Sequence, residues 1–130
     1  MRYGWIFAFA VGCDDNLFGV AEESTPSGLT GYAGVQALFE SDCWACHGSA
    51  PAGNTLDLQT DLIAATVDVD SSYGVPFVVP GDPEGSALYL KLVADPAVGG
   101  VMPPGAPIAD AEIEIVHQWI ADGATQDAAR

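Results

Sequence analysis

The residues with the widest chemical range in this sequence are two cysteines and a histidine placed close together. Cys43, Cys46 and His47 form the stretch CWACH, which holds two of the three cysteines and one of the two histidines of the chain. Thiols and imidazoles ligate metals, and thiols also pair as disulfides or bond covalently to cofactors. The spacing predicts that a ligand or a covalent link is held at this point.

Four interpretations fit the spacing of CWACH. A zinc site needs four protein ligands, and His117 is an available fourth, but the usual paired spacing is absent. A redox dithiol is expected near a βαβ pattern, which the sequence lacks, and a structural disulfide leaves His47 without a role. Haem attachment uses all three residues, because C-x-x-C-H is the signature in which two cysteines bond haem and the histidine ligates iron. The sequence favours haem.

A six-coordinate haem needs a second axial ligand, and few residues can supply it. Met102 is the one methionine besides the initiator, and His117 is the one histidine besides His47. Met102 lies in VGGVMPPGAP, where paired glycines allow a close bend and paired prolines fix φ, so the loop is predicted to be stiff. His117 falls at the edge of the apolar stripe of a predicted helix, as a solvated residue does. Met102 is therefore the predicted distal ligand.

Three stretches with helical periodicity would position these residues. YAGVQALFESD, residues 32–42, leads directly into CWACH. PGDPEGSALYLKLVAD, residues 80–95, begins with Asp82 as a cap and Pro83 at the first helical position, and is predicted to continue through Val93. DAEIEIVHQWIADGA, residues 110–124, has acidic residues in its first turn and a glycine as its stop. Residues 56–79 predict a helical turn near 58–65 and extended chain near 75–79.

The order helix, C-x-x-C-H, MPP, final helix resembles the class I cytochrome c family, monohaem proteins with His and Met axial ligands. It is especially similar to small modules of planctomycete and related bacterial proteins, in which VVPGDPEGSALY and MPP recur in similar form. The resemblance covers residues 32–124 and implies an all-α fold of three to four short helices with long loops around one haem. It implies that Cys43 and Cys46 attach haem c covalently. It also implies that His47 is the proximal ligand and Met102 the distal ligand.

Further contacts to the haem are predicted from residues near these ligands. In cytochromes the ring nitrogen of the proximal histidine that faces away from iron bonds a backbone carbonyl, and Pro51 is the predicted acceptor for His47. Trp44, Tyr73 and Tyr89 have polar tips that suit the haem propionates. The segment 56–79 is predicted to wrap the haem edge.

The N-terminal stretch MRYGWIFAFAVGC predicts export. One Arg precedes an apolar run that is too short to span a bilayer, and a small residue precedes Cys13, so residues 1–12 resemble a bacterial lipoprotein signal and Cys13 a lipidation site. Residues 13–31 are predicted to be a flexible acidic tether before the domain of residues 32–124, and residues 125–130 a tail. The alternative for the first stretch is a buried N-terminal strand with a free thiol.

The charge of the chain restricts its partners. Eighteen Asp and Glu stand against three Lys and Arg, for a net charge of −15. Such a surface repels phosphates, which argues against nucleic acid. Lys91 is the only cation away from the termini, so a basic docking patch is absent and a redox partner that docks by charge must itself be basic. The alternative is that the acidity serves solubility.

These features predict an exported single-electron carrier rather than an enzyme, in the periplasm or on the outer surface, anchored to a bacterial membrane by lipid at Cys13. With both axial positions filled, a haem site transfers electrons. Two alternatives remain open. One is a haem enzyme or ligand sensor in which Met102 dissociates, and the other is a binding module without haem, held by a Cys43–Cys46 disulfide.

Overall fold

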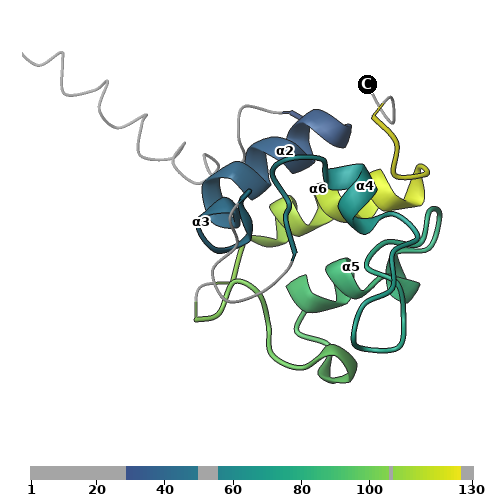
Figure 1. Cartoon of the computed structure of the whole chain (residues 1–130). Helices are drawn as coiled ribbons and strands as arrows, with labels where there is room; N and C mark the ends of the chain where they lie inside the picture. Colours follow the sequence, from purple (N-terminus) through teal and green to yellow (C-terminus); the bar gives the residue numbers. More distant parts are fainter. Residues whose placement is uncertain (1–28, 50–55, 106, 127–130) are drawn as a thin grey trace, which may run out of the picture.

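The computed structural model describes residues 29–49, 56–105 and 107–126 (Figure 1). The predicted signal at residues 1–12, Cys13 and Pro51 lie outside these ranges, as do most of the predicted tether and tail. The described residues contain five short α-helices, two isolated β-bridges and no strand. The helices are α2 (Gly31–Asp42), α3 (Trp44–His47), α4 (Leu62–Thr66), α5 (Ala87–Leu92) and α6 (Asp110–Ala121), with 3-10 helices η2 (Pro83–Gly85) and η3 (Pro96–Val98). The predicted all-α class is confirmed, with five α-helices among the described residues where three to four were expected.

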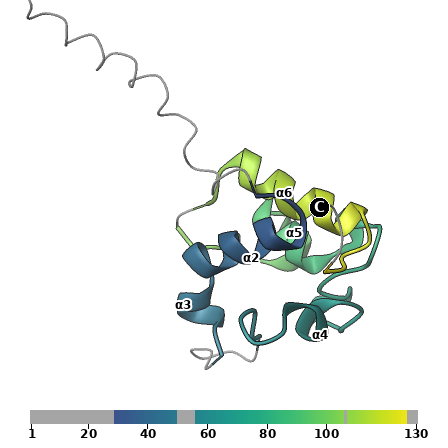
Figure 2. The ribbon, with the colours of Figure 1, turned by 90° about the horizontal axis from the view of Figure 1, so that it is seen from above.

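The core lies mainly between α2 and α6, which pack side by side (Figures 1 and 2). Apolar residues at helical spacing form the inner face of each helix, as the sequence predicts. The fully buried ones are Val35, Leu38 and Phe39 on α2 and Val116, Trp119 and Ile120 on α6. Tyr32 adds a ring contact across the pair, with its centroid 6.2 Å from that of Trp119. The helix that leads into CWACH is thus fixed against the last helix of the fold.

Close approach of these two helices requires a glycine on α2. A Cβ atom added to Gly34 would lie 2.7 Å from the carbonyl oxygen of Leu29 and 3.0 Å from the Cγ2 atom of Ile115 on α6. These separations are at or below the limit for real carbon contacts, so the absence of a side chain at Gly34 lets the helices pack at this distance.

The helix predicted from Pro83 through Val93 is divided into η2 and α5, which corrects the sequence expectation. Asp82 does act as a cap, since its side chain accepts a hydrogen bond from the N–H of Gly85 at 3.1 Å, but it caps only the short η2. Ser86 then adopts an extended backbone. Its hydroxyl donates to the carbonyl of Asp82 and accepts from the N–H of Val79, each at 2.8 Å. These side-chain bonds compete with the main-chain hydrogen bonds of a continuous helix, so the helix is interrupted and α5 begins after Ser86.

The segment 56–79 contains the predicted turn of helix and the predicted extended chain. The turn is α4, whose N-terminus is capped by Asp61 through a 3.0 Å bond from the N–H of Ala64. The extended chain forms the isolated bridges Val67–Val78 and Asp70–Pro76. Among the described residues, no helix has both the length and the apolar character needed to cross a bilayer.

Candidate functional site

One cavity brings together the chemically distinctive residues of the sequence. Its volume is about 490 Å³, within the range of roughly 300–1,000 Å³ that is usual for small-molecule and cofactor sites. Most of its lining is apolar, and Cys43, Cys46, His47 and Met102 all border it. The remaining lining residues are Phe39, Asp42, Leu56, Leu58, Ser72, Tyr73, Phe77, Ala87, Leu88, Lys91, Leu92, Pro103 and Pro104.

The junction of α2 and α3 directs the side chains of Cys43, Cys46 and His47 toward this cavity. The chain leaves α2 at Cys43, whose N–H donates to the carbonyl of Phe39 at 2.8 Å. It turns at once into α3, where the N–H of His47 donates to the carbonyl of Cys43 at 2.8 Å. Residues three and four apart in such a turn share a face, so Cys43, Cys46 and His47 reach one space.

Hydrogen bonds from residues 56–58 hold α3 in place. The N–H of Leu58 donates to the carbonyl of His47 at 2.7 Å, and the indole N–H of Trp44 donates to the carbonyl of Leu58 at 3.1 Å. The Nδ1 atom of His47 lies 3.3 Å from the carbonyl oxygen of Leu56. A proton on Nδ1 would donate to that oxygen, and in this tautomer Nε2 carries the lone pair with which an imidazole ligates a metal. Leu56 thus offers the type of contact predicted for Pro51, which lies outside the described residues.

Asp57 stabilises the turn that presents these two carbonyls. Its Oδ1 atom accepts hydrogen bonds from the backbone N–H groups of Thr60 at 2.9 Å and Gln59 at 2.8 Å. The bonds from Thr60, followed by the bond from Gln59, lower the pKa of Asp57, because they favour the ionised carboxylate. The carboxylate is therefore part of the support beneath His47.

Burial changes the chemistry of Cys43. Burial first, and then the nearby Asp42 and Cys46, raise the pKa of the Cys43 thiol to about 12. In the absence of a metal ion or another nearby positive charge, the raised pKa keeps this thiol protonated near neutral pH. Within the described part of the chain, Cys43 forms no disulfide, and no group of three or more His, Cys, Asp or Glu residues is suited to a metal ion. The lack of such a group among the described residues gives the zinc interpretation no support.

Met102 enters the cavity from a separate segment that follows η3. Its backbone N–H donates to the carbonyl of Lys91 at 3.0 Å, which fixes the chain to the end of α5. Gly99, with φ of 82°, bends the chain in the left-handed region just before it. Met102 and the two prolines after it all line the cavity. The stretch predicted to supply a distal ligand thus borders the same space as His47.

The three aromatic residues considered for the haem propionates lie in different surroundings. Tyr73 lines the cavity, whereas the indole N–H of Trp44 is already bonded to Leu58, and Tyr89 does not line the cavity. Lys91 also lines the cavity, and the sequence reasoning did not place it there. Its position as the single interior cation was a signal that could have drawn attention to it.

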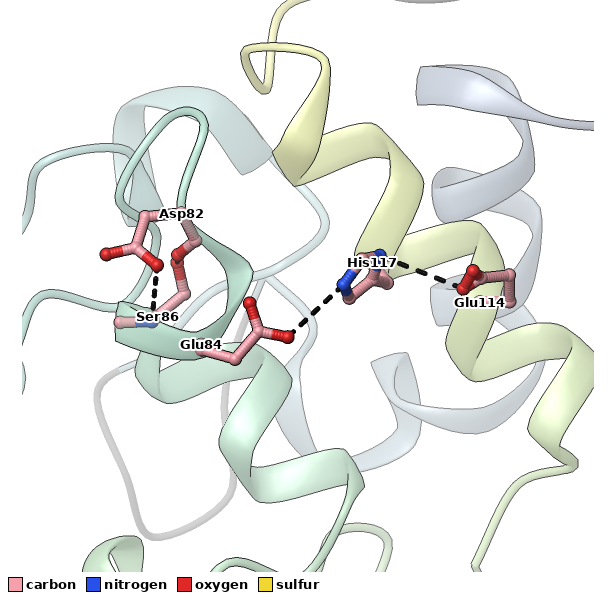
Figure 3. A network of polar contacts seen from close by, with 6 residues as sticks. Asp82, Glu84, Ser86, Glu114 and His117 are labelled. Atoms are coloured by element: carbon pink, nitrogen blue, oxygen red, sulfur yellow. Dashed lines mark hydrogen bonds and ion pairs between the residues drawn. The ribbon is translucent and has the colours of Figure 1, made fainter.

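His117 lies away from the cavity in an acidic cluster (Figure 3). Its ring sits on α6 with Nε2 3.3 Å from Oε2 of Glu84 and Nδ1 3.7 Å from Oε2 of Glu114. Tyr89 packs edge-on against it, with ring centroids 5.1 Å apart. Burial, then Glu84 and Glu114, raise the pKa of Tyr89. His117 is half-buried rather than fully solvated, because η2 covers it, and it does not border the cavity that His47 borders.

Comparison with known proteins points to one family. Residues 43–105 match a family model described as Planctomycete cytochrome C, and the matched stretch includes CWACH and Met102. Searches of curated proteins and of solved structures gave no significant match. The match supports a cytochrome c-like module, which implies haem c and indicates electron transfer rather than catalysis. The cavity fits that group, because its walls are apolar and carry two thiols, an imidazole and a thioether.

Proposed function

We propose that this protein is a single-electron carrier that binds one haem c covalently, with His47 and Met102 as axial ligands. One observation carries the proposal. The thiols and imidazole of CWACH and the thioether of Met102, more than fifty residues later in the sequence, border the same apolar cavity. The family match over residues 43–105 supports it independently.

Each residue has a separate role in this proposal. Cys43 and Cys46 hold the haem through thioether bonds, and His47 offers Nε2 to iron while the Leu56 carbonyl orients its ring. Met102 supplies the second axial ligand. When bound, the haem would supply one-electron redox chemistry at this site. The apolar walls exclude water and favour the less charged ferrous state, which raises the reduction potential.

The charge of the chain supports a partner class. With a net charge of −15, the protein repels acidic proteins and attracts basic ones, so we propose a redox partner with a basic docking surface. We also propose export to the periplasm or outer surface, with a lipid anchor at Cys13. This rests on the signal-like pattern of residues 1–12.

Intact mass and voltammetry of protein made in a bacterium with haem-attachment machinery test this proposal. The wild-type protein should gain the mass of one haem under denaturing conditions and give one reversible one-electron wave. Cys13→Ser is the matched control and should keep the haem, whereas a variant with both Cys43→Ala and Cys46→Ala should lose it. A wild-type chain with no added mass would contradict the proposal and favour the disulfide-held module. If the ferrous protein instead bound carbon monoxide at a low carbon monoxide concentration, the alternative of a haem enzyme or ligand sensor would be favoured.

A further inference from the structure

Lys91 is unusual because it is the only Lys or Arg among the described residues, and it borders the cavity. It occupies the last turn of α5. In a chain with eighteen acidic residues, an interior lysine would be expected to pair with a carboxylate. No salt bridge to Lys91 is present among the described residues; its ammonium group instead contacts a backbone carbonyl and an aromatic ring.

These contacts tie the segment of residues 99–104, called the Met102 segment, to α5 and hold the Lys91 ammonium over Tyr73. The Nζ atom of Lys91 donates to the carbonyl of Gly100 at 3.2 Å, and the backbone carbonyl of Lys91 accepts from the N–H of Met102 at 3.0 Å. One residue thus holds the segment on both sides of Val101. The same Nζ lies 4.6 Å from the centroid of the Tyr73 ring, which is a cation–π contact.

The segment has few other connections to the fold. Among the hydrogen bonds between described residues, Met102 is the one backbone donor between positions 100 and 108 that reaches a main-chain acceptor. Neither Gly100 nor Gly105 packs tightly, since a Cβ added to either would meet no atom within 4 Å. The bonds to Lys91 are therefore a large share of what holds this segment over the cavity.

We infer that Lys91 is a positioning residue that keeps Met102 at the cavity and so sets how readily an outside ligand displaces it. This inference rests on the proposed function, in which Met102 ligates the haem iron. When Met102 swings away, the Nζ bond to Gly100 is broken and the ammonium loses its position over Tyr73. Without the ammonium group the closed segment is less stable, so an outside ligand displaces Met102 more easily.

Imidazole titration of the ferric haem-loaded protein tests the inference, because imidazole competes with Met102 and abolishes the weak sulfur-to-iron absorption band. Lys91→Leu keeps the apolar stem and removes the donor, and should bind imidazole about three- to tenfold more tightly than wild type. Lys91→Arg keeps a cationic donor, so its affinity for imidazole should be close to that of wild type. Val93→Ala, on an exposed side chain just after α5, is the matched control and should bind imidazole as wild type does.

The possible results distinguish a failure of this inference from a failure of the proposed function. A wild-type ferric spectrum without the sulfur band would overturn both, since Met102 would then not be a ligand. A wild-type band, combined with equal imidazole affinity in wild type and Lys91→Leu, would overturn the role of Lys91 alone. An equal gain in affinity in Lys91→Leu and Lys91→Arg would also overturn it, because the gain would not depend on the donor. If Lys91→Leu does not fold, Lys91→Ala, which also lacks a side-chain donor, provides the comparison.

Discussion

Substitution of Gly34 by alanine tests the packing of α2 on α6. The new Cβ would meet the Leu29 carbonyl oxygen at 2.7 Å and the Ile115 side chain at 3.0 Å, and the first of these is backbone that cannot rotate away. Overpacking of this kind costs about 1–3 kcal/mol. Alanine offsets about 1 kcal/mol of that cost through its higher helix propensity. The expected net loss of stability is about 1–2 kcal/mol, since the backbone contact places the clash near the upper end.

The assay is thermal unfolding of the haem-loaded protein, followed by circular dichroism, with denaturant titration as a second measure. The expected fall in Tm is about 4–16 °C, at about 4–8 °C for each kcal/mol in a domain of this size. Ala33→Gly is the control, because Ala33 is exposed on the same helix and should lose about 1 kcal/mol by propensity alone. If Gly34→Ala instead raised stability by that amount, propensity would dominate and the proposed close contact would be refuted.

Three further substitutions probe the support of the site. Trp44→Phe removes the indole donor to the Leu58 carbonyl and should lower the free energy of unfolding by about 1 kcal/mol in denaturant titration. An unchanged denaturation midpoint would show that this hydrogen bond does not stabilise the fold. Asp57→Asn should lower Tm at pH 7. The difference in Tm from wild type should shrink as the pH falls through the depressed folded pKa of Asp57. A difference in Tm that does not depend on pH would count against a stabilising role of the Asp57 carboxylate. His117→Gln should leave the ferric absorption spectrum unchanged, because His117 contacts Glu84 and does not line the cavity; a shift to high spin would identify it as a ligand.

The first and last helices could be predicted because their signals are local. α2 and α6 each carry apolar residues at helical spacing, and their termini agree closely with the predicted stretches. The interruption after η2 could not be predicted in this way. It depends on the hydroxyl of Ser86 bonding Val79, which becomes its neighbour only when the chain folds. Helix propensity alone favoured one continuous helix from Pro83.

The site residues, like the helices, can be divided into those that the sequence marks locally and those that depend on the fold. Cys43, Cys46 and His47 form a contiguous motif, and Met102 could be selected because the composition leaves few alternatives. Their common cavity agrees with that selection. The contact between His47 and Leu56 joins two positions nine residues apart in the sequence, and no residue type marks a backbone carbonyl as an acceptor. Such supports depend on tertiary structure rather than on side-chain chemistry.

Lys91 shows how composition can identify a residue without revealing its role. The sequence singles it out as the interior cation, and that fact was used only to exclude a basic docking patch. Its contacts with Gly100 and Tyr73 connect three segments, so they emerge only from the fold. The predictions at Cys13 and Pro51 lie outside the described residues and stay predictions.

The central claim is that CWACH and Met102 hold one haem between them, and the absorption spectrum of the ferric protein tests it most directly. The protein is made with haem-attachment machinery and purified without added ligand. We predict a low-spin spectrum with the weak long-wavelength sulfur-to-iron band, and loss of that band in Met102→Ala. A low-spin spectrum without the band, unchanged by Met102→Ala, would contradict the account, since another residue would then occupy the second axial position.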